Sequence, residues 1–367
     1  MRRLVTLDNP IRRALVGSGV LAVPLVVFAV VVALLLGPAE QQVAINFFIS
    51  LIAVVGFGIY SGNSGIMTFG HVAFMGIAAY AGSLLTMSPA IKAQALPNLI
   101  PALRDVQVPF VPALVGALVV VAALAFAFGF PLSRLSAAAT PIATLAMLMI
   151  TYVVLVGAAD ITRGSQTFYG VPPITDLTVA VVFALLAIVV ARLFRESVLG
   201  LRIRASREDE LAARSMGVDV ANLRLVAWIL SALVVGVAGM LLGHNLTAFS
   251  PKQFYLTLQF ALVAMLVVGG PTTVTGAAGG AFLIALLMES ARRVEGLVSG
   301  LTLGPIRIEQ FFGLQEIALG LVILAVMYRR REGLFGRLEV DEVLVRWWHG
   351  RPTVSRPPRA GDSGPSP

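Results

Sequence analysis

Long apolar runs separated by short polar segments dominate this 367-residue sequence. About 20 mostly apolar residues are needed to cross a hydrocarbon core roughly 30 Å thick, and several runs reach that length. Because every backbone amide inside lipid needs a partner within the protein, such spans are helices. The pattern predicts an all-α transmembrane bundle of about ten spans (range about 8–10), near 14–36, 44–60, 66–87, 110–130, 139–158, 177–194, 222–243, 256–269, 276–290 and 312–328.

Composition and charge support a membrane protein with both termini in the cytoplasm. Apolar residues make up 58% of the chain and charged residues 13%, whereas soluble domains carry roughly 25% charged residues. The net charge of +8 follows from basic residues that flank the spans, so it does not indicate nucleic-acid binding. If the N-terminus is inside, most of the 27 Lys and Arg residues fall on the cytoplasmic side.

The same pattern divides the chain into a membrane domain and two flanking segments. Residues 1–13 are predicted to be a cytoplasmic N-terminus, and 14–337 a transmembrane domain that contains a cytoplasmic segment at 195–221. The tail, 338–367, is rich in proline and polar residues, so it is predicted to be disordered and cytoplasmic.

The segment 195–221 is the only sizeable charged stretch between predicted spans. Ser206 is expected to cap a helix that opens with acidic residues and ends at Gly217. Small and apolar residues then form one face of that helix: Leu211, Ala212, Ser215 and Met216. The face suits a groove on another protein, and a solvated helix without a partner is the alternative.

The stretch "GNSGIMTFGHVAFMGIAAYAGSLL" (62–85) places glycines and polar groups within apolar surroundings. Irregular backbone at membrane depth is tolerated where it is buried in protein or lines a watery cavity. We expect a re-entrant or broken helix. Its polar residues either line a translocation path or form hydrogen bonds with neighbouring helices, and both roles are compatible for different residues.

Other chemistry is sparse. Three scattered histidines and no cysteine make a metal site unexpected, and no phosphate-binding P-loop is present. The middles of the spans lack the acidic and basic groups of ion-coupled transporters. Glu289 is expected to pair with Arg292 or Arg293, one helical turn away. The chain therefore reads as a transport pathway without its own energy source, and not as an enzyme.

Four motifs in order give the sequence a family resemblance. "ELAARSMG" (210–217) resembles the coupling loop of ABC importer permeases, and the longer string around it resembles the branched-chain amino acid permease family. "SGIMTFGHVAFMGIAAYAGSLL" (64–85), "VVGGPTTVTGAAGGAFL" (267–283) and "YRRREGLFG" (328–336) are similar to that family's motifs, in the LivM-type form.

The resemblance implies a permease subunit of an ABC importer in the bacterial inner membrane. It implies two ATPase subunits, a second LivH-type permease that completes a heterodimer, and an external binding protein. The chain itself would bind no cofactor, because its partners use ATP and magnesium. The implied coupling residues are Arg207, Glu208, Glu210, Ala212, Ala213, Met216 and Gly217. The candidate path residues are Asn63, Ser64, Gly65, Thr68, Gly70, His71, Phe74, Gly269 and Gly270.

Two alternatives stay open at this point. Related permeases carry urea and short amides, and the motifs do not separate these substrates from leucine, isoleucine or valine. A passive channel for small solutes would share the apolar bundle, although it has no need of a docking helix at 206–217.

Overall fold

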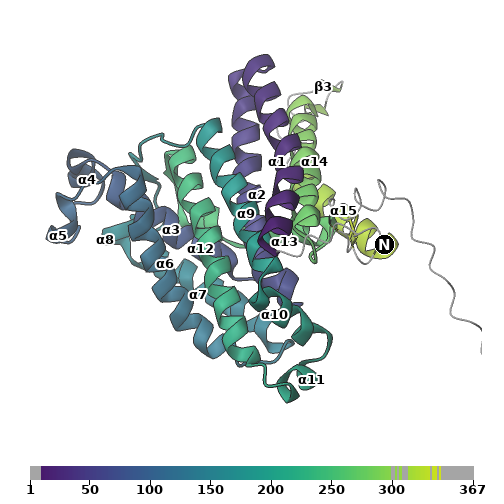
Figure 1. Cartoon of the computed structure of the whole chain (residues 1–367). Coiled ribbons are helices and arrows are strands. Elements are labelled where there is room, and N and C mark those ends of the chain that lie inside the picture. Colours follow the sequence, from purple (N-terminus) through teal and green to yellow (C-terminus); the bar gives the residue numbers. More distant parts are fainter. Residues whose placement is uncertain are drawn as a thin grey trace, which may run out of the picture.

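The computed structural model describes residues 10–298, 302–303, 306–307, 313–330, 333–336 and 339 (Figure 1). The apolar helices are α1 (Pro10–Leu35), α2 (Pro38–Ser64), α3 (His71–Thr86), α6 (Phe110–Leu132), α7 (Ala139–Gly157), α9 (Leu177–Glu196), α12 (Val220–Leu246), α13 (Leu256–Gly269), α14 (Val274–Val298) and α15 (Leu314–Arg329). The connecting helices are α4 (Pro89–Ala95), α5 (Pro101–Arg104), α8 (Ala159–Thr162), α10 (Val198–Glu208), α11 (Glu210–Ser215) and the 3-10 turn η1 (Pro251–Phe254).

Each predicted span corresponds to one of the apolar helices. Among the described residues, eight stretches are long and apolar enough to cross a membrane, and α13 reaches that length when it is counted together with η1. The apolar helices α3 and α15 are shorter. The polytopic helical bundle is therefore confirmed, within the predicted range of spans. The predicted tail lies outside the described residues except for Glu339, and the N-terminal segment is described only from Pro10 onward.

In the described part of the chain, two pairs of short strands connect loop segments. β1 (Phe168–Tyr169) pairs antiparallel with β2 (Ala248–Phe249), so that Phe168 lies opposite Phe249. β3 (Thr302–Leu303) pairs antiparallel with β4 (Ile306–Arg307). The first pair ties the loop after α8 to the loop after α12, and it packs against Tyr80 of α3.

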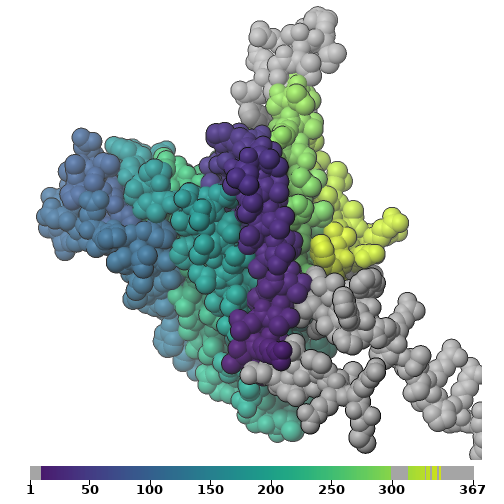
Figure 2. Space-filling model, turned by 45° about the horizontal axis from the view of Figure 1, so that its top comes forward, coloured from purple at the N-terminus to yellow at the C-terminus, as the bar shows by residue number. Residues whose placement is uncertain are grey.

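The core of the bundle is the packing of α12 against α2 and α3. The backbones of α12 and α3 approach closely at Gly239, where a Cβ atom would lie 2.2 Å from the carbonyl oxygen of Met75. Only a glycine permits this backbone contact. α2 is the most buried of the long spans, whereas α1 exposes many apolar side chains and runs along the outside of the molecule (Figure 2).

The connections define the two ends of the bundle. α10 and α11 project together at one end, here named the α11 end, and β3 marks the opposite end (Figure 1). The start of α2 and the end of α14 both lie toward the opposite end, where Arg293 approaches Glu40 at 3.9 Å.

Candidate functional site

The segment between α9 and α12 folds as two helices joined at one extended residue. Asp209 has φ −149° and ψ 106°, and its carboxylate accepts a hydrogen bond from the backbone N–H of Ala212 at 2.9 Å. It therefore caps α11. Gly217 adopts a left-handed conformation, with φ +77°, directly after this helix. The prediction that the helix ends at Gly217 is confirmed, because glycine is favoured at that position.

The predicted start of this helix is wrong. Ser206 lies inside α10, is buried, and donates its hydroxyl proton to the carbonyl of Ile203 at 2.8 Å. α10 continues through Ser206 because Ile203 and Ser206 both face the bundle. The turn comes three residues later, where the carboxylate of Asp209 offers a charged acceptor to the amides of a new helix.

α11 presents an exposed face at the end of the molecule (Figure 1). Leu211 is 77% exposed and Met216 84% exposed, whereas Ala213 is the buried residue of the helix. Ala212 and Gly217 are exposed as well. The structure therefore places the predicted face on the surface, with two large apolar side chains that nothing in the described part of the chain covers.

Glu210 anchors α11 to the start of α12. Its carboxylate forms ion pairs with Arg214 and Arg224, both at 2.7 Å, and the side chain of Arg224 is 7% exposed. Partial burial raises the pKa of the Glu210 carboxyl, but hydrogen bonds from Arg224 and Arg214 outweigh it, so the pKa lies below its usual value. Glu210 is therefore ionised at neutral pH and holds the two helices together.

Arg207 connects α10 with the end of α2. Its guanidinium donates to the carbonyl oxygen of Gly62 at 3.2 Å, and its alkyl chain covers Gly65, where a Cβ atom would lie 2.7 Å from Cγ. Glu208 is exposed and approaches Arg207 at 3.8 Å. A displacement of α10 would therefore act directly on the place where α2 ends.

The predicted break in the membrane helix is present between α2 and α3. Gly65 is left-handed (φ +73°), and residues 65–70 are not helical. Two side chains from distant spans satisfy backbone groups that the break releases. Thr144 of α7 accepts from the N–H of Phe69 at 2.9 Å, and Gln259 of α13 accepts from the N–H of Val72 at 3.1 Å. Neighbouring spans thus enclose most of the break, as irregular backbone at membrane depth requires, and Gly65 is its exposed residue.

His71 begins α3 and is bonded on both ring nitrogens. Ser231 Oγ donates its proton to the carbonyl of Gly56 at 2.7 Å, so it accepts from His71 Nε2, also at 2.7 Å. His71 Nδ1 then accepts from the hydroxyl of Thr68 at 2.7 Å. These contacts hold the start of α3 against α2 and α12, and they assign His71 a neutral imidazole with the proton on Nε2.

The candidate path residues of this stretch lie mostly inside the bundle. Thr68, His71 and Phe74 are fully buried, and Gly70 packs against the carbonyl of Thr144, which a Cβ atom would approach to 2.6 Å. Ser64 is buried and donates to the carbonyl of Tyr60 at 2.8 Å. Gly65 is the exposed member, beside Arg207.

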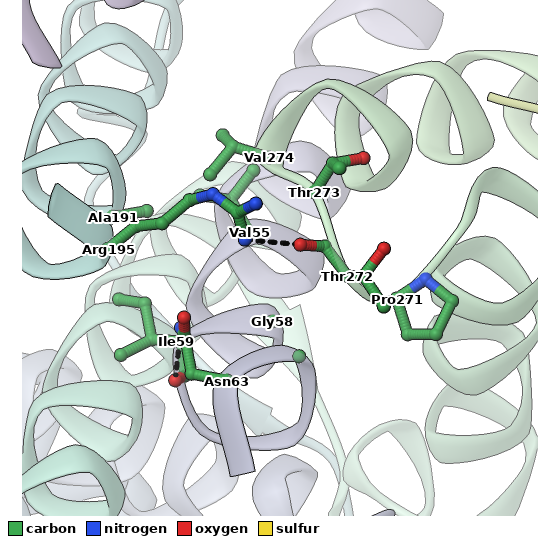
Figure 3. A pocket seen from close by; sticks show the side chains of 11 residues that line it. Val55, Gly58, Ile59, Asn63, Ala191, Arg195, Pro271, Thr272, Thr273 and Val274 are labelled. Carbon is green, nitrogen blue, oxygen red and sulfur yellow. Dashed lines mark hydrogen bonds between the residues drawn. The ribbon is translucent and has the colours of Figure 1, made fainter. Parts of the chain in front are cut away.

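Asn63 reaches a small cavity between α2, α9 and the turn before α14 (Figure 3). The cavity has a volume of about 10 Å³, roughly the space of one water molecule. Asn63 Nδ2 donates to the carbonyl of Ile59 at 2.9 Å, while its Oδ1 has no partner in the described part of the chain. Across the cavity, Arg195 donates to the carbonyl of Thr272.

Gly269 and Gly270 form the tight turn between α13 and α14. A Cβ atom on Gly269 would lie 1.9 Å from the carbonyl oxygen of Gly276, and Gly270 has φ +120°. The C-terminal motif closes this turn, because the N–H groups of Leu334 and Phe335 donate to the carbonyls of Val268 and Gly269 at 2.9 and 3.1 Å. The candidate path residues Gly269 and Gly270 thus take part in close backbone packing at this turn.

Glu339 adds a buried ionic contact beside the same turn. It forms ion pairs with Arg192 at 3.3 Å and Arg195 at 3.1 Å. Its carboxylate also accepts from the backbone N–H groups of Val274 and Thr275, both at 3.0 Å, where α14 begins. The chain that follows α15 is therefore attached to α9 and α14 through one carboxylate.

The larger cavities lie toward the opposite end of the bundle. One, of about 480 Å³, is lined by α2, α13, α14 and Gln315 of α15, and another, of about 590 Å³, by α2, α3, α12, η1, α13 and Met288 of α14. Asn46 and Ser50 of α2 border both cavities. The sequence reasoning missed these residues, although their four-residue spacing within an apolar run was a usable signal.

Glu289 lines the first of these cavities and pairs with both neighbouring arginines, at 2.8 Å to Arg292 and 2.7 Å to Arg293. The predicted local ion pair is confirmed.

Across the described residues, no group of three His, Cys, Asp or Glu side chains is placed to hold a metal ion.

Comparisons with known proteins relate the chain to transport permeases. The chain is 27% identical over 281 residues to the high-affinity branched-chain amino acid transport system permease protein LivM of Salmonella typhimurium, covering 67% of this chain and 62% of the relative. It is 26% identical over 307 residues to LivM of Escherichia coli, covering 74% and 67%. The match thus spans about two thirds of each relative.

A shorter match covers 24% of this chain and 27% of the probable branched-chain amino acid transport permease protein LivH of Methanocaldococcus jannaschii, with 37% identity over 87 residues. No solved structure matches the chain. A family model described as the permease component of the branched-chain amino acid transport system matches residues 41–327, from α2 to the end of the last apolar helix. Because that match covers most of the molecule, the chain belongs to the branched-chain amino acid transport system permease family.

Proposed function

We propose that the chain is the permease subunit of an ABC importer that moves branched-chain amino acids across the bacterial inner membrane. One observation carries the coupling role. α11 exposes Leu211 and Met216 at the α11 end, while Glu210 and Arg207 fasten the same segment to α12 and to the end of α2. The segment therefore combines an uncovered docking face with rigid contacts to two central spans.

The α11 end is assigned to the cytoplasm. Most of the basic residues belong to the segments that the positive-inside rule places there. Two ATPase subunits would dock on the exposed face of α11, and their ATP-driven closure would move α10, α2 and α12 together. The chain itself binds no cofactor in this scheme, and an alternating-access movement opens the path to one side at a time.

A second permease of LivH type would complete the pathway, and an external binding protein would deliver the substrate. Leucine, isoleucine and valine are the proposed substrates, because the family and the LivM relatives are described by branched-chain amino acid transport. Urea and short amides are the rival substrates. A passive channel is the rival mechanism, and it leaves the exposed face of α11 without a role.

Purification of the tagged chain from its native membrane in mild detergent tests the proposal. We expect two ATPases and a second permease to accompany the wild-type chain, and Leu211→Asp and Met216→Asp to lose the ATPases. Ile100→Asp is the matched control, since Ile100 is an exposed apolar residue (51%) in the loop between α4 and α5, away from α11. Purification of the wild-type chain alone, under conditions that preserve known transporters, would contradict the proposal.

A further inference from the structure

The two larger cavities are neighbours, and α2, α13 and α14 contribute to both. They share Asn46, Ser50 and Met288, so they adjoin, and their volumes of about 480 and about 590 Å³ fall in the range of small-molecule sites. We name their union the α2–α13 cavity. Its polar members include Gln42, Asn46, Ser50, Lys252, Gln253, Thr257, Glu289 and Arg292.

Polar side chains on α2 extend this cavity into the membrane domain. Gln42, Asn46 and Ser50 are spaced by four residues, so they share one face of an otherwise apolar helix. Ser50 lies about 18 Å along the helix from Pro38, at 1.5 Å per residue. Polar groups at that depth are costly against lipid, so this face meets water, a solute or another protein.

The orientation of Asn46 is set by a neighbour. Asn245 of α12 accepts from Gln42 Nε2 at 2.9 Å and donates its own amide proton to Asn46 Oδ1 at 2.8 Å. The oxygen of Asn46 is therefore occupied, and in the described part of the chain its amide nitrogen has no partner. Asn46 thus offers N–H donors at the border of the two cavities.

The charges of the cavity favour a ligand with a carboxylate. Lys252 lines it and has no carboxylate partner among the described residues. Glu289 is already neutralised by Arg292 and Arg293. The lining therefore carries an excess of positive charge. Urea and acetamide have no ionised group, so they would gain little from Lys252.

The floor of the cavity is apolar and adaptable. It is formed by Ile49, Met75, Leu258, Leu262 and Met288. Methionine side chains are flexible, so Met75 and Met288 can adjust to aliphatic groups of different branching. Nitrogen donors and an aliphatic surface within one lining match a small amino acid.

We infer that the α2–α13 cavity is this chain's half of the transported solute's binding site. It takes a small aliphatic amino acid, whose carboxylate binds Asn46 Nδ2 and Lys252 Nζ and whose side chain lies on the methionine and leucine floor. The inference rests on the proposed importer function and adds the residues that distinguish an amino acid from an amide.

Thiol labelling of the assembled transporter tests the inference, because the chain contains no cysteine of its own. Ser50→Cys and Thr257→Cys are introduced singly, and the complex is treated with a charged, membrane-impermeant maleimide. Val27→Cys is the control on the outer face of α1, where Val27 is 56% exposed. We expect both cavity positions to react, and the control to resist because a thiol that faces lipid does not ionise.

Protection by solutes identifies the ligand. Leucine, supplied with its external binding protein, should slow labelling at both positions by about tenfold or more, which corresponds to about 1.4 kcal/mol. Acetamide should not. Lys252→Gln should abolish protection by leucine, and Lys252→Arg should retain it because the positive charge remains.

The outcomes separate this inference from the importer proposal. Unreactive cysteines, or cysteines that leucine does not protect, in a complex that retains its ATPases and ATP-dependent uptake would overturn the site alone. Equal protection by acetamide would overturn the carboxylate assignment. A wild-type chain that purifies without ATPases would contradict the importer proposal and overturn this inference with it.

Discussion

At the scale of single residues, the two arginines beside Glu210 are unequal. The side chain of Arg224 is 7% exposed and that of Arg214 is 58% exposed. Glu210→Gln would leave the buried Arg224 without its counter-charge, so we expect a loss of about 1–3 kcal/mol in the free energy of unfolding. Arg214→Gln should stay within about 0.5 kcal/mol. Thermal unfolding of the purified complexes measures both, and equal effects would contradict the anchoring role of Arg224.

Acid should reproduce part of the Glu210→Gln effect. The folded-state pKa of Glu210 lies below its usual value, so the stabilisation that it provides is complete above that usual value, near 4.5. It is lost as the pH falls through the lower folded-state pKa. We therefore expect the protection of the α11 amides, measured relative to an unstructured peptide at the same pH, to be unchanged between pH 7 and 5 and to fall only below about pH 4.5. Loss of protection already near pH 6, with Glu210 intact, would assign the change to another group.

Gly239 sets the distance between the two central helices. A Cβ atom there would lie 2.2 Å from the oxygen and 2.4 Å from the Cα atom of Met75, and neither backbone atom can move independently of α3. Gly239→Ala should therefore destabilise the bundle by about 1–3 kcal/mol or more, as overpacking does. Gly19→Ala is the matched control, because no atom lies within 4 Å of its Cβ position in α1 and alanine favours a helix. A similar melting temperature for both variants would contradict the close crossing.

At the scale of elements, the structure and the sequence analysis differ on where the helix before Gly217 begins. The structure places its cap at Asp209, whereas the sequence suggested Ser206. Loss of a capping side chain costs about 1 kcal/mol, so Asp209→Ala should speed hydrogen exchange of the amides at 210–216, and Asp209→Asn should restore most of the protection. Ser206→Ala should leave these amides unchanged, because its hydroxyl bonds Ile203 inside α10. Faster exchange in Ser206→Ala than in Asp209→Ala would instead support the helix start that the sequence suggests.

The elements that sequence analysis located correctly are those whose signal is local. Each apolar run became a helix because a span must satisfy its own backbone, and the break after Ser64 follows from the glycines around it. The boundary at Asp209 was missed because the helical path of 198–208 depends on which residues face the bundle. Which residues of α10 face the bundle is decided by its packing against α2 and α12. A local sequence pattern does not contain that information.

The candidate site illustrates the same limit. The exposed face of α11 was predicted correctly from helical spacing alone. The polar residues of 62–71 were conspicuous in the sequence, yet in the structure His71 forms hydrogen bonds with Thr68 and with Ser231. Packing was one of two roles left open for them, and a spacing pattern cannot reveal which distant helix supplies a partner. Asn46 and Ser50 were less conspicuous, and they line the larger cavities.

At the scale of the whole molecule, Glu339 connects the chain beyond the last span to the core. It is buried between Arg192, Arg195 and the start of α14. Glu339→Ala would remove the counter-charge of two buried arginines, and such losses cost about 3–5 kcal/mol. Glu316→Gln, at an exposed position in the first turn of α15, should change stability by less than about 0.5 kcal/mol. Unfolding of the two variants in detergent provides the test, and a stable Glu339→Ala chain would show that the contact is dispensable.

The short length of α3 has a consequence for the order in which the protein is made. Its 16 residues reach about 24 Å, less than the roughly 30 Å of the hydrocarbon core, so it cannot cross the bilayer as an independent unit. The N–H of Val72, near the start of α3, donates to Gln259, and α3 packs mainly against α12. Both of these partners leave the ribosome much later. The nascent chain must therefore hold α3 in a provisional position until more than half of the protein has been synthesised. The insertion of α3 is then completed by helices that follow it in the sequence.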